Sequence, residues 1–310
     1  MQLAALMPLF LAMSLYLLTL GIGHWLTPRR ASTMVKIRYA TLLLTAGTLA
    51  LALFHLHEDM SSSINHMDSL CLPLWLLVAM GLSAGSFTLG FLHQQSSLAK
   101  EMGRWSKSAS PALRRTMADL AARLQIRQIP QLRIVTLAQP MAFVVGTIQP
   151  TIYLSTWMIE QLTPAELEAV LAHELAHIAR SDNLIALIST ALLGATAFVP
   201  TSWWALRALM KERELATDAL AVSVTGKPIT LARGLLKATV PAASSFNAAA
   251  GLLEVSMVEE RVSHLVELHE AGSSHWQHPI EQRWIWLLTL MSPIPLAWII
   301  FDVPHLLNLP

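Results

Sequence analysis

Four uncharged runs of this chain are each long enough to cross a lipid bilayer, and they restrict the fold more than any other feature. A helix needs about 20 apolar residues to span the hydrocarbon core. Only 13% of the 310 residues are charged, whereas about 25% is usual for a soluble domain. We therefore predict a mainly α-helical, polytopic membrane protein with a helical transmembrane bundle. The runs are Met1–Trp25, Tyr39–His57, a segment within Ser69–Leu92, and Trp284–Phe301.

The charges between these runs predict their orientation. Lysine and arginine are concentrated between the first two runs and after the third, whereas the loop between the second and third runs is acidic and has no basic residue. Basic loops stay on the cytoplasmic side. We therefore expect an external N-terminus, three N-terminal spans within residues 1–93, a cytoplasmic segment 94–283, and a fourth span with a short external tail in 284–310.

Charge and cysteine content exclude other classes of protein. The net charge is +1, which gives no reason to expect direct binding of nucleic acid. Cys71 is the only cysteine in the sequence, so neither an internal disulfide nor a cysteine-rich metal site can form. A metal transporter would need ionisable residues inside its spans, but His24, His55 and His57 lie only at or near span ends.

The segment from His173 to His177 has the sequence H-E-L-A-H and lies in a predicted helix. Four residues make about one helical turn, so both imidazoles project from one face and can share a metal ion. Glu174 would then lie beside the metal, where it could act as a general base on a water molecule. This layout is typical of a zinc peptidase site.

The start of the motif helix is marked by Thr163, Pro164 and Glu166. Thr163 can cap the helix, proline suits the first helical position, and Glu166 completes a capping box. We expect the helix to run to about Arg180 with one apolar, buried side. The alternative is a pair of core histidines beside a solvated glutamate, and the capped, apolar helix makes it the less favoured interpretation.

A catalytic zinc site needs a third protein ligand, and Glu214 is the candidate. Glu214 and Asp218 are spaced four residues apart and face the same way on a second predicted helix. Glu214 can bind the metal, while Asp218 can accept the far ring N–H of a ligand histidine and fix its tautomer. The alternative is a charged, solvated helix face, which the apolar neighbours of these residues disfavour.

This pairing constrains a fifth uncharged run, Asn183–Leu206. If the run crossed the bilayer once, His177 and Glu214 would lie on opposite sides of the membrane. Crossing twice needs about 40 residues plus a turn, which exceeds the interval between these two residues. We therefore predict a re-entrant, interfacial or core element that turns near Pro200 and Thr201.

The region before the motif predicts the remainder of an α+β domain. Pro111–Leu124 has the pattern of a basic amphipathic helix, which could be simply a solvated helix on the membrane surface. Gln131–Thr136 and Thr151–Leu154 have the pattern of strands. Between them, Pro140–Gly146 is apolar and closed by a glycine. It predicts either an edge strand that receives a substrate peptide or an ordinary hairpin beside the core.

H-E-L-A-H at 173–177 and E-R-E-L-A-T-D at 212–218, placed after three N-terminal spans, resemble the BlaR/MecR-type membrane metallopeptidases. These are relatives of the HtpX and CAAX-prenyl endopeptidases, and the resemblance covers roughly residues 110–264. It implies a cytoplasmic zincin-like peptidase domain of the gluzincin type in a bacterial inner membrane. It further implies one zinc ion held by His173, His177 and Glu214, with Glu174 as general base. We expect Asp218 and Asp182 to support the ligands.

The resemblance also implies a signalling role, in which an external cue activates cleavage of a cytoplasmic transcriptional repressor. Well-known family members carry an external domain that binds beta-lactams after the last span. Only nine residues follow Phe301 in this sequence, so we do not expect that sensor domain. Thr217 is a second departure, because many members have cysteine at this position.

The residue that stabilises the oxyanion is left open by the sequence. Arg261 lies in Val255–Leu265, which is similar to a weaker downstream family segment. The candidates are Arg261, His264, His275 and His278, but for each of them an ordinary polar contact is the favoured interpretation.

Two further functions remain open at this stage. One is a membrane-protein quality-control peptidase of the HtpX type. The other is a non-enzymatic membrane receptor or scaffold that retains a structural zinc.

Overall fold

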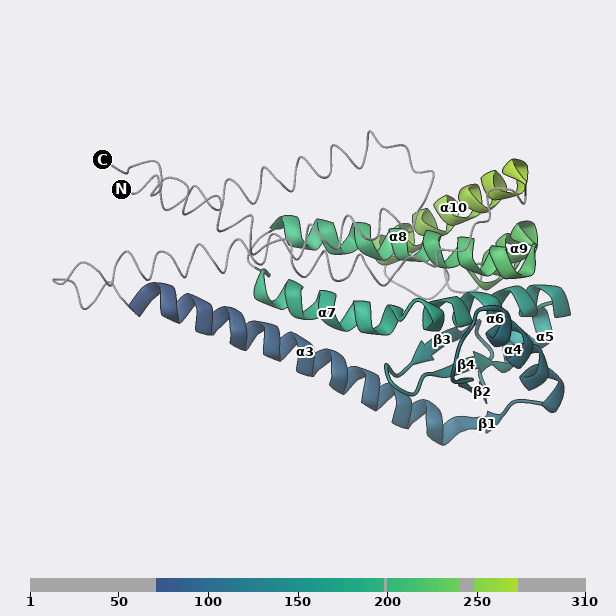
Figure 1. Cartoon of the computed structure of the whole chain (residues 1–310), viewed down its shortest axis with the longest axis horizontal. Helices are drawn as coiled ribbons and strands as arrows, with labels where there is room; N and C mark the ends of the chain where they lie inside the picture. The colour runs from purple at the N-terminus through teal and green to yellow at the C-terminus, as the bar shows by residue number, and fades with distance from the viewer. Residues whose placement is uncertain (1–70, 198–199, 240–247, 273–310) are drawn as a thin grey trace. The chain divides into compact units, whose positions relative to one another are not determined.

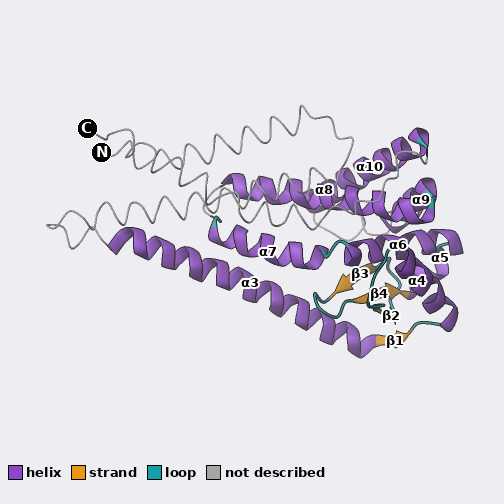
Figure 2. Cartoon of the chain, viewed as in Figure 1, coloured by secondary structure: helices purple, strands orange, loops and turns teal. Residues whose placement is uncertain are grey.

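The computed structural model of this chain describes residues 71–197, 200–239 and 248–272 (Figure 1). These residues form mainly helices together with one small mixed sheet (Figure 2), as the sequence predicts for the catalytic region. Three of the expected spans, Met1–Trp25, Tyr39–His57 and Trp284–Phe301, lie outside the described residues. His275 and His278 lie outside them as well.

The chain divides into two compact units. The described residues of unit 1 are 71–90 and 187–210 without 198 and 199, and those of unit 2 are 91–186, 211–239 and 248–272. The H-E-L-A-H segment and Glu214 both belong to unit 2. Most of the fifth apolar run groups with unit 1, so the chain leaves unit 2 after the motif helix and returns to it before Glu214.

Unit 1 contains the first part of helix α3 (Cys71–Trp105), most of α7 (Asp182–Ala195) and the start of α8 (Pro200–Thr225). Helices α3 and α7 approach closely at Gly194, where an added Cβ would lie 2.9 Å from the Cα of Ala84. A side chain at this position would therefore push the two helices apart.

The third expected span falls on the first part of α3. Among the described helices, none is by itself long and apolar enough to cross a membrane. Helices α6 (Pro164–Ala179) and α7 meet the requirements of length and composition only as a pair, and the pair is bent by 56°. The membrane bundle therefore stays a prediction.

The fifth apolar run is interrupted where the sequence predicts a turn. Helix α7 ends at Ala195, and α8 begins at Pro200. On the near side of the break, the Thr196 hydroxyl donates to the carbonyl of Leu192 at 2.8 Å. The indole of Trp203 donates to the carbonyl of Ala197 at 2.9 Å. The Trp203 bond gives the Ala197 carbonyl a partner beyond the end of α7, whereas the Leu192 carbonyl also accepts from the backbone N–H of Thr196.

Unit 2 contains a four-stranded sheet with the order β1-β2-β4-β3. β2 and β4 are parallel, and each pairs with an outer strand in antiparallel fashion. The sequence predicts β2 and β4 to within two residues, but it gives no sign of β1. The strands are β1 (Ser106–Ser108), β2 (Gln131–Val135), β3 (Ala142–Val145) and β4 (Thr151–Ser155).

Alternate residues of the strands face two different clusters of core residues, as the period of a strand requires. Leu132, Ile152 and Leu154 join the main core with α4 (Pro111–Arg123) and α6. Val135 and Tyr153 instead pack with the C-terminal part of α3. Helix α4 buries Met117, Leu120 and Ala121, so it is a packed element of this core. The interpretation of α4 as only a surface helix is therefore not supported.

Three further helices complete unit 2. α5 (Thr156–Gln161) follows β4 directly, and α9 (Pro228–Thr239) packs against α6. α10 (Ala248–Ala271) packs against α9. Leu231 of α9 and Leu265 of α10 are both fully or almost fully buried in the main core. This packing positions α6, α8 and α10 around one site.

Candidate metal centre

The motif helix α6 begins at the predicted capping box. The Thr163 hydroxyl accepts from the backbone N–H of Glu166 at 3.3 Å, and the Glu166 carboxylate accepts from the N–H of Thr163 at 2.9 Å. Lys237 of α9 also donates to Glu166, at 2.7 Å. At the other end, Ser181 adopts a left-handed conformation with φ +57° and connects α6 to α7. Both ends of the motif helix are therefore fixed.

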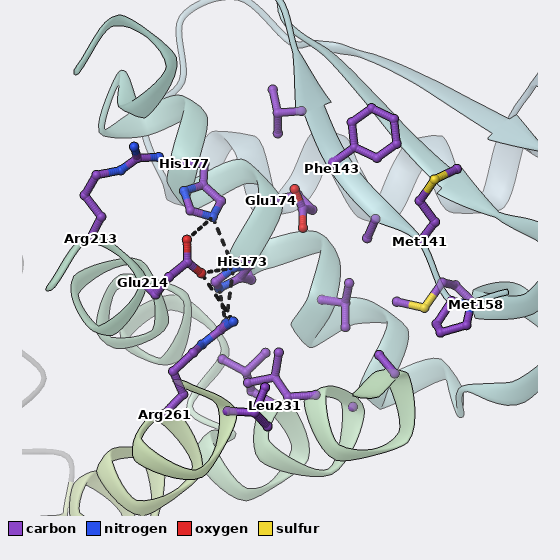
Figure 3. Close-up of a pocket in the computed structure, with 18 of the residues that line it drawn as sticks. Met141, Phe143, Met158, His173, Glu174, His177, Arg213, Glu214, Leu231 and Arg261 are labelled. Carbon is purple, nitrogen blue, oxygen red and sulfur yellow. Dashed lines mark hydrogen bonds and ion pairs between the residues drawn. The ribbon is translucent and has the colours of Figure 1, made fainter. Parts of the chain in front are cut away.

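His173, His177 and Glu214 converge in unit 2 (Figure 3). The two Nε2 atoms lie 3.2 Å apart. The Glu214 carboxylate oxygens lie 3.5 Å from Nε2 of His173 and 3.8 Å from Nε2 of His177. Each side chain offers one ligand atom, and these three atoms all lie within 4.8 Å of one another, so together they could hold a metal ion. The two residues of α6 and the one residue of α8 that the sequence selects are thus brought together.

Each histidine is oriented by its own buried carboxylate. Nδ1 of His177 lies 2.7 Å from Asp182, and Nδ1 of His173 lies 2.8 Å from Asp218. An ionised carboxylate only accepts hydrogen bonds, so each Nδ1 donates and each Nε2 is the nitrogen that can lose its proton to a metal ion. The two Nε2 atoms and the Glu214 carboxylate then face one another, so a metal ion that replaces the Nε2 protons would have three ligands.

The donor set also fits zinc in spacing. Zinc binds imidazole nitrogen at about 2.0–2.1 Å with tetrahedral geometry, which places two such ligands roughly 3.3 Å apart. The distance of 3.2 Å between the Nε2 atoms agrees with this value. Two histidines and one glutamate are also the protein ligands of one class of catalytic zinc site.

The electrostatics keep the carboxylates of Asp182, Glu214 and Asp218 ionised. Burial raises the pKa of each of these carboxyls, but their cationic and hydrogen-bonding neighbours outweigh it and lower the pKa overall. The main opposing groups are His177 and Arg180 for Asp182, Arg261 for Asp218, and both histidines for Glu214. For His173, burial and Arg261 lower the pKa, whereas Asp218 and Glu214 raise it to about 9 overall.

Asp182 has a second set of neighbours that the sequence does not reveal. Its other oxygen, Oδ1, lies 3.4 Å from Nε of Arg180 and 3.9 Å from Nε of Arg213. The hydroxyl of Thr217 lies 3.2 Å from the Oδ2 atom that His177 contacts. Asp182 and Thr217 are both fully buried. Thr217 therefore packs directly against the carboxylate that orients His177.

Glu174 lies in a pocket of about 500 Å³ beside the three candidate ligands. Glu174 is 7% exposed, and Figure 3 shows its carboxylate on the side of the pocket that faces Phe143 of β3. The pocket also has an apolar lining contributed by α5, α6 and α9. This lining includes Met158, Val170, Leu231 and Leu235.

The expected apolar segment 140–146 contributes one wall of the pocket. Pro140, Met141, Ala142, Phe143 and Val144 all line it. β3 pairs with β4 as a hairpin and lies at one end of the described sheet. Both sequence interpretations of this segment are therefore compatible with the structure, because the hairpin strand is also an edge strand at the pocket.

The two described candidates for oxyanion stabilisation differ in position. Arg261 lines the pocket, but its guanidinium is engaged by Asp218 and Glu214. His264 is not among the pocket residues, and its Nδ1 lies 3.8 Å from Glu267. The pairing of Arg261 with Asp218 has no sequence signal, because the two residues are 43 positions apart.

This arrangement is that of metallopeptidases with an H-E-x-x-H helix. It has two histidines one turn apart, a glutamate between them and a further glutamate on a second helix. Residues 9–265 match the family model of the BlaR1 peptidase M56. Because this match covers most of the chain, the protein belongs to that family, and the resemblance inferred from the sequence is confirmed.

Several relatives are named as homologues of the protease HtpX. Protease HtpX homolog 2 of Methanosarcina acetivorans is 30% identical over 206 residues, which cover 53% of this chain and 67% of the relative. Protease HtpX homolog 2 of Methanosarcina mazei is 29% identical over 43% of this chain and 56% of its own length. Protease HtpX homolog 1 of Streptomyces coelicolor is 29% identical over 42% of this chain and 54% of its own length. The chain thus spans between about half and two thirds of the length of these relatives.

Proposed function

We propose that this chain is a zinc-dependent endopeptidase of the membrane, which hydrolyses peptide bonds in the pocket beside β3. The observation that carries the proposal is the convergence of His173, His177 and Glu214 within 4.8 Å at a pocket that also contains Glu174. The family match and the protease names of the relatives support a peptidase.

His173, His177 and Glu214 would hold the zinc ion, and Asp218 and Asp182 would keep the two imidazoles in the tautomer that this requires. When bound, zinc supplies a Lewis acid for the scissile carbonyl and lowers the pKa of water to about 7. Imidazole nitrogen with one carboxylate suits zinc better than magnesium or calcium, which prefer oxygen ligands.

Glu174 would act as the general base. Its carboxylate takes a proton from water as the water oxygen forms a bond to the carbonyl carbon. It then gives this proton to the amine nitrogen as the C–N bond breaks. A positioned acid–base group of this kind contributes typically about 10²–10⁴-fold to the rate. The near-complete burial of Glu174 limits its access to bulk solvent.

The substrate would bind as an extended segment along β3. An edge strand offers unpaired backbone groups to which a peptide can add as a further strand. The side chains of such a peptide alternate, so one of them would point toward the apolar wall of Met158, Val170 and Leu231. We propose a substrate with an apolar side chain next to the bond that is cut.

For the cellular role, our first proposal is signalling. In this proposal the peptidase lies on the cytoplasmic face of a bacterial inner membrane and inactivates a transcriptional repressor. Support comes from the loop charges and from the family to which the chain belongs. The second candidate is quality control of membrane proteins, which the HtpX names of the relatives favour. A non-enzymatic scaffold with structural zinc is the third.

Substitution of the base tests the activity. Full-length Glu174→Ala, purified from membranes, is expected to retain about one zinc ion per chain and to lose cleavage by about 10²-fold or more. Glu168→Ala is the matched control, because Glu168 lies on the same helix and pairs with Lys227 on the surface. Cleavage by Glu174→Ala at the wild-type rate would contradict the proposal, and so would wild-type protein that binds no metal.

A trapping experiment separates the cellular roles. Glu174→Ala expressed in membranes should retain uncut substrate, which can be recovered with the protein and identified. One predominant soluble repressor supports signalling. A broad set of misfolded membrane proteins supports quality control. If Glu174→Gln rescues a full deletion phenotype, neither peptidase role is needed and the scaffold is favoured.

A further inference from the structure

Arg261 of α10 joins two acidic side chains of the metal centre. Its Nε and Nη2 atoms each lie 2.7 Å from a different oxygen of Asp218, which makes the pair bidentate. Its Nη1 lies 3.2 Å from Oε2 of Glu214. The Arg261 side chain is 13% exposed, and that of Asp218 is fully buried. A bidentate arginine–carboxylate pair fixes the orientation of the carboxylate as well as its distance.

Both carboxylates that Arg261 contacts act on the metal centre. Asp218 Oδ1 accepts from Nδ1 of His173 at 2.8 Å, and Glu214 is itself the third candidate ligand. Arg261 therefore reaches His173 through Asp218 as well as directly, and it reaches Glu214 directly. Figure 3 shows its guanidinium below His173 and Glu214, with dashed contacts to both.

We infer that Arg261 is a positioning residue, which holds Asp218 and Glu214 in the orientation that lets His173 and Glu214 bind a metal ion together. This inference rests on the proposed function, because it assumes that the three residues bind a metal. It assigns Arg261 a role different from the stabilisation of a substrate oxyanion.

The hydrogen-bond capacity of Arg261 favours this role. A guanidinium has five N–H groups. Two of them are used by Asp218, and Nη1 faces Glu214. Nη2 also lies 3.3 Å from Nε2 of His173. A metal ion on Nε2 of His173 would displace that last contact, but three of the five N–H groups still face carboxylates, and the positive charge is already paired with two of them.

Arg261 also affects the metal through its charge, and this effect has the opposite sign. A positive charge beside a divalent cation weakens metal binding, whereas correct placement of the ligands strengthens it. Arg261→Lys separates the two effects, because lysine keeps the charge but cannot form the planar fork. A change of metal affinity in this variant therefore reports the loss of positioning.

The test is the zinc affinity of the full-length chain in detergent, measured by competition with a chromophoric chelator. We expect Arg261→Lys to bind zinc about 10–100-fold more weakly than wild type, the range for loss of a group that orients ligands. Asp218→Asn should show a loss in the same range. The double variant should lose less than the product of the two single losses, because both act on one interaction.

Arg233→Met is the matched control, since Arg233 is exposed on α9, and it should bind zinc like wild type. If Arg261→Lys does not fold, Arg261→Gln takes its place. Removal of a positive charge favours zinc binding, so weaker binding by Arg261→Gln would still report lost positioning. Wild-type or tighter affinity in the folded variant, with a loss only in kcat, would overturn the inference. A wild-type chain that binds no zinc would instead refute the proposed function.

Discussion

Asp182 Oδ2 lies 2.7 Å from Nδ1 of His177, although the two residues belong to different helices. The contact depends on the left-handed conformation of Ser181, which ends α6 and lets α7 start one residue later. The first residue of α7 thus faces back toward the last turn of α6. Since Asp182 also lies near Arg180 and Arg213, one buried carboxylate connects a candidate ligand with two cations.

Asp182→Asn is expected to weaken both metal binding and the fold. The neutral amide no longer fixes the tautomer of His177, so zinc affinity should fall by about 10–100-fold. The variant also leaves the buried Arg180 without its charge partner, and breaking such a pair costs about 3–5 kcal/mol. Zinc competition and denaturant unfolding measure the two effects. Asp119→Asn is the control, because Asp119 forms an exposed pair with Arg123. Equal stability of the two variants would contradict the assigned role of Asp182.

The parts of the site that the sequence predicts are those that depend on local spacing. The capping box of Thr163 and Glu166, the one-turn spacing of His173 and His177, and the position of Glu214 on a second helix all follow from helical periodicity. Each is a property of fewer than about 20 consecutive residues. Because each feature depends only on nearby residues, each could be predicted without knowledge of the tertiary structure.

The parts that could not be predicted depend on distant contacts. β1 is short and polar, and it forms only because Ser106–Ser108 pairs with β2. The pairing of Arg261 with Asp218 requires the position of α10, which no residue near Arg261 specifies. For the same reason, the sequence could not show that residues 187–210 group with unit 1. In each case tertiary packing, rather than local propensity, determines the arrangement.

Acid is expected to weaken the fold through Glu166. Burial raises the pKa of this carboxyl, but Lys237 and the N–H of Thr163 lower it overall, below its ordinary value of 4.5. The stabilisation by Glu166 is therefore fully present above about pH 4.5 and is lost as the pH falls through the lowered pKa of the folded state. In metal-free protein, the difference in unfolding free energy between wild type and Glu166→Gln should shrink over this range.

A pair of lysine variants provides the control for Glu166. Lys237→Met leaves the buried carboxylate of Glu166 without its cation. Lys227→Met removes the cation of Glu168, whose side chain is 25% exposed. We expect the first variant to lower the unfolding free energy more than the second at pH 7. If the difference in unfolding free energy between wild type and Glu166→Gln is the same at pH 6 and pH 3, the stabilisation does not come from the ionised Glu166.

Gly146→Ala is expected to distort the β3–β4 hairpin at the pocket. Gly146 has φ +96°, and an added Cβ would lie 2.8 Å from the carbonyl oxygen of Gln149. Strain of this kind costs about 1–3 kcal/mol. Since Gly146 also accepts a 2.7 Å hydrogen bond from Asn183, displacement of β3 should raise KM for peptides more than it lowers kcat. Gly103→Ala in α3 is the control, because an added Cβ there meets nothing within 4 Å. If both alanine variants show the same stability and KM, the turn does not control the edge strand.

Gly234 of α9 is expected to control the size of the apolar part of the pocket. An added Cβ would lie 3.4 Å from Val170 Cγ2, an ordinary contact, so Gly234→Ala should fold and gain about 0.5–1 kcal/mol in the helix. Gly234→Leu would fill space that a substrate side chain otherwise occupies, because Gly234 and Val170 both line the pocket.

The measurement is kcat/KM for two peptides that differ only in having phenylalanine or alanine next to the scissile bond. Wild type should prefer phenylalanine, and Gly234→Leu should lower this preference by about tenfold or more, as expected for a change in pocket volume. Leu236→Ala is the control, since Leu236 is 47% exposed on the same helix and does not line the pocket. If Gly234→Leu cuts both peptides with the wild-type ratio, the substrate side chain does not bind at this wall.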